Sequence, residues 1–450
     1  MAEQHEVQAM SYPFGPPEPP FSFETLVSYF HTVLDALPDQ RTGNNVLYSM
    51  KDAALGAFAV FFTQSPSFLA FQKAMQEAKG ISNAQTLFGM GEIPCDNRIR
   101  TLLDGVPPTA LDPLFASIFR GLVAGGYLTE WRAINGTLLL ALDGLQYFSS
   151  AAIHCATCST AQHANGTVSY SHQALTPVLV APGNDKVIPL MPEFITPQDG
   201  HDKQDCETAA AKRWLQHYGA CYQSLGITVL GDDLYCRQPL CEPLLQVGFN
   251  FILVCKPSSH PTLYDWLAGL KVASLVQRRW TGRSQEIDTY RYVNRLPLRD
   301  GNAALEVNWC ELTTTREDGT VLYHNSWVTN YNLTQENVTA IVTTGRARWK
   351  IENENNNILK NRGYHFEHNY GHGQQYLASF LATLNLLAFL VHTVLELIDT
   401  KYRLLRDVLP TRQTFFDDIR ALTRYLCFAS WDDLLTFMLR GLEREIPNTS

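Results

Sequence analysis

Three acidic residues stand at positions from which carboxylates could hold divalent metal ions. Asp143 follows a continuous apolar run at 137–142, and Asp232 follows a second apolar run at 227–230. Glu352 lies in a segment whose composition suits a long helix. Carboxylates from two strands and a helix can bind two ions about 4 Å apart, one activating a water or hydroxyl and the other stabilising the leaving oxygen. Oxygen ligands of this kind favour Mg²⁺ or Mn²⁺.

A mixed sheet is the element that would bring two of these acids together. The first strands are expected to form an antiparallel meander, and the later alternation of helix and strand predicts the parallel half of an α/β sheet. Active sites of open α/β sheets lie beyond the carboxyl ends of strands, which is where Asp143 and Asp232 fall. The predicted strands are 137–142, 167–180, 186–195, 227–230 and 250–254, and the predicted helices between them are 203–218 and 243–246.

An Asp after a strand is more commonly a turn or cap residue, so the strings around each acid matter. ALDGLQYFSS at 141–150, GDDLY at 231–235 and RWKIEN at 348–353 resemble, in order and spacing, the three motif regions of DDE transposases of the insertion-sequence four family. The third region continues into KNRGY at 360–364 and EHNYGHG at 367–373.

This resemblance covers roughly residues 138–397 and implies a ribonuclease-H-like catalytic core with an all-β insertion between the second and third acids. It also implies an enzyme that cleaves DNA and transfers the cut strand, with Asp143, Asp232 and Glu352 binding two Mg²⁺ or Mn²⁺ ions. The implied partners are inverted repeats at the element's ends, target DNA and a second copy of the chain in the DNA complex. The implied location is the cytoplasm, on the bacterial nucleoid.

Members of this family carry a Tyr…Arg…Glu…Lys signature around the third acid, and this chain matches it in part. Arg348 stands four residues before Glu352, as in the family, whereas Gly345 occupies the Tyr position. Lys360 follows Glu352 by eight residues rather than seven, which on an α-helix turns it about 80° from that face. The resemblance implies DNA-phosphate contacts for Arg348 and, at its displaced position, Lys360.

Two neighbouring acids compete for the same roles. Asp233 is an alternative to Asp232 as the second acid, although Asp232 fits the family's spacing to Tyr235. On an α-helix Glu354 points about 200° away from Glu352, so it is predicted to be a solvated surface residue.

The predicted insertion, 257–332, carries a candidate base-stacking residue. Members of the family resemble one another in using a tryptophan of the insertion to hold a flipped base. Flipping a base out of the duplex exposes it for stacking on an aromatic ring. Trp280 is the candidate for this role, whereas Trp309 and Trp327 lie in alternating strand patterns and are predicted core residues. The arginines around Trp280 that could bind phosphate are Arg278, Arg279 and Arg283.

The overall charge opposes nucleic-acid binding, but the local charge favours it. The net charge is −9 and the isoelectric point is about 5.8, whereas DNA-binding proteins usually present a basic surface. Between residues 256 and 300, however, eight basic residues face four acidic ones. This stretch is therefore the predicted DNA-binding surface.

A second kind of metal site is suggested by Cys155, Cys158 and His163, which match the first three spacings of a zinc knuckle. The fourth expected cysteine is missing, so His172 or His154 would have to complete a structural zinc site. The alternative is that these are ordinary cysteines in a hairpin between two strands.

Composition indicates a folded globular protein, since 45% of the 450 residues are hydrophobic and 18% are charged. The acidic, Pro-rich first twenty residues predict a disordered leader without a signal peptide, so the ten cysteines are expected to stay reduced. The apolar segment 374–395 is predicted to be a buried helix, not a membrane span, because Asn385 and His392 interrupt it. The predicted regions are a leader (1–20), a helical domain for DNA-end binding or dimerisation (21–130), the catalytic core (131–256 and 333–400), the insertion (257–332) and a C-terminal helical segment (401–450).

Three other functions fit parts of the sequence. The same three acids would support a ribonuclease-H-like nuclease without strand transfer. A domesticated, non-catalytic DNA-binding protein is a second possibility, which the presence of all three acids opposes. A metal-dependent phosphohydrolase is the third, suggested by the group Asp199, His201, Asp202 and Asp205; acids there also suit the start of a helix.

Overall fold

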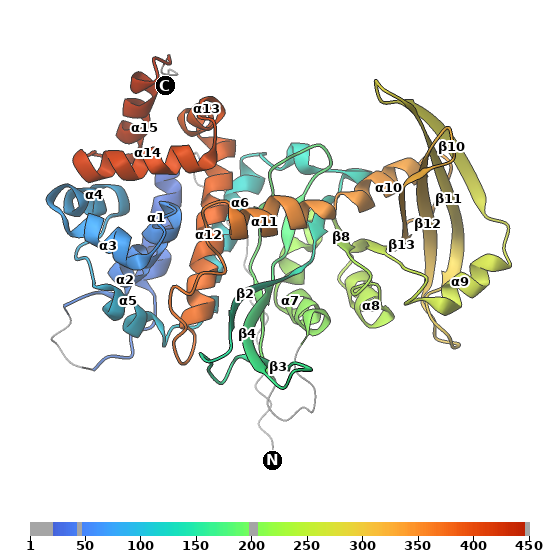
Figure 1. Ribbon diagram of the computed structural model, residues 1–450, viewed down its shortest axis with the longest axis horizontal. Helices are drawn as coiled ribbons and strands as arrows, with labels where there is room; N and C mark the ends of the chain where they lie inside the picture. Colours follow the sequence, from blue (N-terminus) through green and yellow to red (C-terminus); the bar gives the residue numbers. More distant parts are fainter. Residues whose placement is uncertain (1–20, 43–46, 198–205, 446–450) are drawn as a thin grey trace.

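The computed structural model describes residues 21–42, 47–197 and 206–445. These residues form a mixed α/β protein in which a nine-stranded mixed sheet is flanked by helices, as predicted at that level (Figure 1). The predicted leader, 1–20, lies outside the described residues. The group Asp199, His201, Asp202 and Asp205 lies outside them as well.

Five short strands form one half of the large sheet, with β6 at its edge. β1 (Leu138–Ala141) pairs in parallel with β8 (Ile227–Gly231), which pairs in parallel with β9 (Asn250–Val254). On its other side β1 pairs antiparallel with β5 (Val178–Val180), and β5 pairs antiparallel with β6 (Ile188–Pro189). Nearly every side chain in these strands is buried, which explains their continuous apolar runs.

The predicted meander is correct only for β1, β5 and β6. The predicted strand 167–180 is two strands, because Thr176 and Pro177 interrupt it and Pro177 lacks the N–H that a central strand needs. Its first half, β4 (Val168–Leu175), belongs to a separate four-stranded sheet. The other strands of that sheet are β2 (Gly144–Ser150), β3 (Ser159–Gln162) and β7 (Glu193–Ile195).

The predicted insertion extends the large sheet instead of forming a separate body. Its strands run antiparallel in the order β10, β11, β12 and β13, and β13 pairs with β9. The region also contains α9 (Pro261–Ala268), so the prediction that it is all-β was wrong; proline at the first helical position favours that helix start. Trp309 and Trp327 are buried, as predicted. The strand bounds are β10 (Ala273–Trp280), β11 (Gln285–Pro297), β12 (Glu306–Arg316) and β13 (Val321–Thr329).

Helices from both ends of the described chain pack into one helical body, at the left of Figure 1. The Asn83 side chain donates hydrogen bonds to the carbonyl oxygens of Thr423 and Leu426, both at 2.7 Å. The predicted regions 21–130 and 401–450 therefore fold together. The helices are α1 (Phe23–Asp35), α2 (Met50–Phe62), α3 (Phe68–Gln76), α4 (Ala78–Phe88), α5 (Asp96–Leu103), α6 (Asp112–Ala124), α13 (Thr400–Val408), α14 (Arg412–Tyr425) and α15 (Trp431–Gly441).

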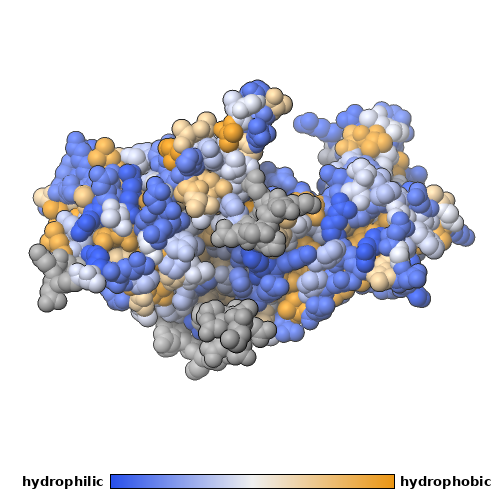
Figure 2. Space-filling view, turned by 90° about the horizontal axis from the view of Figure 1, so that it is seen from below, coloured by the Kyte–Doolittle hydropathy of each residue, from blue (hydrophilic) through white to orange (hydrophobic). Residues whose placement is uncertain are grey.

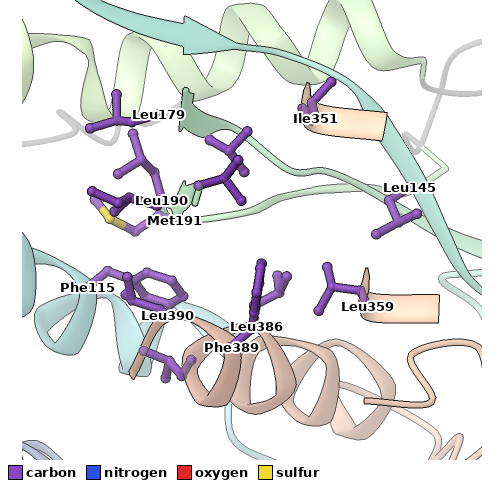
Figure 3. Close-up of a cluster of buried hydrophobic side chains, with 14 of the residues drawn as sticks. Phe115, Leu145, Leu179, Leu190, Met191, Ile351, Leu359, Leu386, Phe389 and Leu390 are labelled. Atoms are coloured by element: carbon purple, nitrogen blue, oxygen red, sulfur yellow. The ribbon is translucent and has the colours of Figure 1, made fainter. Parts of the chain in front are cut away.

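One helix joins the helical body to the sheet. α12 (Leu377–Ile398) packs against α2 on one side and β6 on the other, and it is buried along most of its length. Within the described ranges it is the one helix long and apolar enough to cross a membrane, and its burial agrees with the predicted core helix. Figure 3 shows Leu386, Phe389 and Leu390 of α12 in a buried apolar cluster beneath the sheet.

The remaining helices lie around the sheet. They are α7 (Glu207–Tyr222), α8 (Gln238–Gln246), α10 (Val338–Arg346), a π-helical turn (Ile351–Asn356), α11 (Asn357–Asn361) and 3₁₀ turns at Pro108–Leu111, Thr129–Trp131, Ile134–Gly136 and Gln223–Leu225. The face seen in Figure 2 is largely hydrophilic, with apolar residues in small separate groups.

Candidate functional site

The first two acids lie side by side at the carboxyl ends of neighbouring parallel strands. Ala141 of β1 is paired with Leu230 of β8, and the Leu142 N–H donates to the Leu230 carbonyl oxygen at 2.9 Å. Asp143 lies two residues after Ala141, and Asp232 lies two residues after Leu230. The predicted placement of these acids at adjacent strand ends is therefore confirmed.

The third acid lies on a helical segment that is broken where a long helix was predicted. α10 ends at Arg346, and Glu352 falls in the π-helical turn, a feature that occurs frequently at functional sites. The side chains of Ile351 and Leu359 are fully buried and belong to the apolar cluster of Figure 3. These two residues fix the segment against the core, while the Glu352 side chain stays half exposed.

The electrostatics of Asp143 show that the acids form one group. Burial is the main reason that the pKa of Asp143 is raised, to about 6, and the next cause is the charge of Glu207. Glu352 and Asp232 raise the pKa further, whereas Arg348 lowers it. Strand, strand and helix thus bring Asp232 and Glu352 within electrostatic reach of Asp143.

The carboxylate oxygens nevertheless lie apart. In the described part of the chain, two groups of three or more metal-binding side chains have all their ligand atoms within 4.8 Å of one another. The three acids belong to neither group. Like charges repel, and Glu352 is held by Arg348 through an ion pair of 2.6 Å. The donor set still fits Mg²⁺ or Mn²⁺ by its chemistry, because all three side chains offer the carboxylate oxygens that these ions prefer.

Two residues of this site were missed by sequence reasoning. The Asn356 side chain donates to the Asp143 carboxylate at 2.8 Å, and it comes from the same π-helical turn as Glu352. Glu207, the first residue of α7, accepts from the Tyr235 hydroxyl at 3.0 Å. Gly144 leaves the room for Glu207, since a Cβ there would lie 2.3 Å from its carboxyl carbon. An acid in the first turn of a helix ordinarily indicates only a favourable dipole interaction.

A Glu207→Gln change should lower the pKa of Asp143, because it removes a neighbouring charge and keeps an acceptor for Tyr235. In the wild type we expect Mg²⁺ affinity to fall as the pH drops through about 6, where Asp143 becomes protonated. In the variant this fall should occur at lower pH. Calorimetric Mg²⁺ titrations from pH 5 to 8 measure it, with the exposed Glu317→Gln as the control; coincident profiles would contradict the proposed role of Glu207.

The π-helical turn changes the expectation for Lys360. A π turn accommodates one residue more than an α turn, so eight residues across it return to the face that seven reach in an α-helix. The predicted 80° displacement of Lys360 from Glu352 assumed a regular α-helix, which this segment is not. The Lys360 ammonium pairs with Glu367 at 2.7 Å and is partly exposed. Glu354 is half buried, not the solvated residue that was predicted.

The alternative second acid has a different task. Asp233 accepts hydrogen bonds from the Lys256 N–H, at 2.7 Å, and from the Ser259 hydroxyl. It thereby ties the turn after β8 to the loop after β9. The Asp232 carboxylate accepts from the Leu234 N–H at 2.8 Å, within its own turn, and is half buried.

The residues predicted to contact DNA from the extension lie on an exposed edge strand. Trp280 is 70% exposed at the end of β10. Arg278 and Arg283 are exposed, whereas Arg279 pairs with Glu286 at 2.5 Å and with Asp288 at 3.4 Å. Arg279 is therefore less available to phosphate than the other two arginines.

The predicted thiol cluster is assembled with one change of ligand. Cys155, Cys158 and His172 come together, and the fourth member is His372. His163 instead hydrogen-bonds the Ser169 hydroxyl at 2.8 Å, and the ring of His154 packs on that of Tyr170. His372 lies 200 residues from His172 in the chain, so no local spacing could reveal it.

The distances within this cluster are those of a tetrahedral metal site. The two Sγ atoms are 3.8 Å apart, the two Nε2 atoms are 3.1 Å apart, and three of the four S–N separations are 3.3, 3.4 and 3.6 Å. Four ligands around zinc, at about 2.3 Å for sulfur and 2.05 Å for nitrogen, would be separated by about 3.8, 3.3 and 3.5 Å respectively. The His372 Nδ1 lies 3.0 Å from the Gly373 carbonyl oxygen, which fixes the ring with Nε2 toward the cluster.

Comparison with known proteins adds no family assignment. No model of a known protein family matches the chain, and no curated protein matches it. The function is therefore argued from the geometry above.

Proposed function

We propose that this protein is a DNA transposase in which Asp143, Asp232 and Glu352 carry metal-dependent strand cleavage and strand transfer. The observation that carries the proposal is the convergence of three ordered acids from two parallel strand ends and one helical turn on a single electrostatic group. The strand order β6-β5-β1-β8-β9, with β5 antiparallel to β1, supports a ribonuclease-H-like core. The first acid follows its central strand.

Each residue of the site has a distinct task in this proposal. Two Mg²⁺ or Mn²⁺ ions held by the three carboxylates would supply water or 3′-hydroxyl activation and leaving-oxygen stabilisation. Asn356 orients the Asp143 carboxylate, and the Tyr235 hydroxyl holds Glu207 beside it. Arg348 exchanges its ion pair with Glu352 for a DNA phosphate, because Glu352 is then needed at the metal.

The proposal includes DNA, in the form of inverted repeats and target, and a second copy of the chain as partners. Phosphate contacts come from Arg348, Lys360 and the exposed arginines of β10 and the turn after it, and base stacking comes from Trp280. A cytoplasmic location on the nucleoid follows from this function.

Changing Arg278, Arg279 and Arg283 together to Ala should flatten the salt dependence of DNA binding. Each phosphate contact contributes a slope of about −0.9 in log affinity against log salt. We expect a loss of about two units, because Arg279 is already paired with Glu286 and Asp288. Binding isotherms over a salt series measure it. Arg279→Ala alone and the distant Arg444→Ala should leave the slope unchanged, and a coincident slope for the triple variant would remove this edge from the DNA-binding surface.

The test of the overall function uses the DNA that flanks the protein's own coding sequence, joined to a plasmid and mixed with a second target plasmid. Mg²⁺-dependent cleavage with joined products would support a transposase. Cleavage without joined products would favour the ribonuclease-H-like nuclease. DNA binding with no cleavage in Mg²⁺ or Mn²⁺ would contradict both and favour the non-catalytic DNA-binding protein.

We also propose that Cys155, Cys158, His172 and His372 bind a structural Zn²⁺. The support is the match of five of the six ligand–ligand distances to a tetrahedral Cys₂His₂ site and the hydrogen bond that orients His372. Such an ion would fasten the four-stranded sheet, which begins directly after Asp143, to the segment that follows Glu352 and α11. It would therefore fix the position of Asp143 relative to that of Glu352.

A further inference from the structure

A second cluster of soft ligands lies next to the second acid. Cys236 closes the turn that carries Asp232, Cys255 directly follows β9, and His260 precedes α9. Their ligand atoms all lie within 4.8 Å of one another, and all three side chains are buried. β8 and β9 are adjacent and parallel, so the residues after them meet at the same end of the sheet.

We propose that Cys236, Cys255 and His260 form a second site for a thiophilic divalent cation such as Zn²⁺, with three protein ligands. This site is separate from the Cys₂His₂ centre and does not depend on the transposase function. Two thiols and an imidazole match the ligands that zinc accepts, whereas Mg²⁺ prefers oxygen alone.

The imidazole of His260 is prepared for a ligand. Its Nε2 is buried and has no hydrogen-bond partner among the described residues, while the ring hydrogen-bonds the backbone of Leu298. A buried polar nitrogen without a hydrogen bond is unfavourable, so a ligand bound at this atom is favoured. A cation bound through Nε2 would remove that cost.

Asp233 lies beside the set but outside it, because its carboxylate oxygens are not within 4.8 Å of all three ligand atoms. Its Oδ1 lies 3.5 Å from the His260 Nε2. The Lys256 N–H and the Ser259 hydroxyl donate to this carboxylate and fix its direction. Its negative charge would favour a cation bound through Nε2.

An ion here would lock three loops together. The turn carrying Asp232, the end of β9 and the start of α9 all contribute ligands, and α9 leads into the β10–β13 extension. The position of the second acid would then be tied to that of the edge strand bearing Trp280. The proposed zinc therefore joins the candidate catalytic end of the sheet to its proposed DNA-binding end.

The test is the zinc content of each variant, measured by elemental mass spectrometry on protein prepared without chelator. We expect two equivalents in the wild type, one in Cys236→Ser/Cys255→Ser and one in Cys155→Ser/Cys158→Ser. The control Cys221→Ser/Cys427→Ser should keep two. His260→Gln with a wild-type circular dichroism spectrum should also hold one equivalent, which separates loss of the site from loss of the fold.

Three outcomes would overturn the proposal. The first is a single equivalent in the wild type that disappears in Cys155→Ser/Cys158→Ser. The second is an unchanged zinc content in the folded His260→Gln variant. The third is a disulfide between Cys236 and Cys255 in protein kept under reducing conditions, detected by peptide mass. None of these measurements depends on DNA cleavage, so failure of the proposed function would leave this site standing.

Discussion

An Asp143→Asn protein is expected to lose Mg²⁺-dependent DNA cleavage by about 10³-fold or more, which corresponds to about 4 kcal/mol of transition-state stabilisation. Asp232→Asn and Glu352→Gln should cause losses of the same order, because each removes one ligand from the shared carboxylate group. Single-turnover cleavage of labelled DNA measures the rate. DNA binding should remain close to that of the wild type.

The same substitution should not weaken the fold. Burial and neighbouring charges raise the pKa of Asp143 to about 6 in the folded chain, above its unfolded value of about 3.9. The ionised carboxyl therefore costs stability increasingly as the pH rises from about 4 through 6, and the neutral Asn removes that cost. At pH 8 we expect an equal or higher melting temperature for Asp143→Asn, and at pH 4 no difference.

The controls for this prediction lie near the site and far from it. Glu354→Gln is two residues from Glu352, and Glu317→Gln lies in the exposed turn between β12 and β13. Both should cleave DNA at near the wild-type rate. Substantial cleavage by any one of the three acid variants would remove that residue from the site, and a melting temperature lowered together with activity would indicate a structural role.

The second large effect is expected on the zinc content and the stability of the protein when His372, the proposed zinc ligand from a distant part of the chain, is removed. A His372→Ala change should lower the zinc content by one equivalent, because His372 brings the fourth ligand, a second nitrogen, to the Cys₂His₂ centre. Where free zinc exceeds the dissociation constant about a thousandfold, the lost binding corresponds to about 4 kcal/mol of the free energy of unfolding. Thermal unfolding and elemental analysis on the same sample measure both quantities.

His163→Ala is the matched control for this change. The spacing in the sequence makes His163 a ligand, whereas the structure gives it a hydrogen bond to Ser169. Its zinc content should equal that of the wild type. Equal zinc content in His372→Ala and the wild type would contradict the Cys₂His₂ site, and so would a zinc loss in His163→Ala.

Local pattern was enough to place the two aspartates. Each follows a fully buried, largely apolar strand, and a strand end is visible in a single stretch of sequence. The sheet pairing then brings them together without further information. Glu352 was likewise placed on a helical segment from the local composition of the sequence. The π-helical turn, however, depends on how Ile351 and Leu359 pack in the core, and the periodicity of the sequence does not show this packing.

Contacts between distant segments were the part that sequence could not give. Glu207, Asn356 and His372 are recognisable only after the chain has brought them next to Asp143 or Cys158. The pairing of β13 with β9 could not be predicted either. The alternation of apolar and polar residues within a strand does not show which other strand it pairs with. The strand-rich insertion was therefore identified, while its union with the central sheet was not.

The aromatic packing in the helical body has a consequence for the synthesis of the protein. The Trp431 ring lies among those of Phe23, Phe62 and Phe88, with centroids 5.8, 5.0 and 5.5 Å away. A ribosome adds about 5–20 residues per second, so the stretch from Phe88 to Trp431 takes roughly 20 to 70 s to emerge. During that time Phe23, Phe62 and Phe88 lack their partner. The packing of α1, α2 and α4 is thus completed only after the rest of the described chain up to α15 has been made, and chaperones have that interval in which to bind these helices.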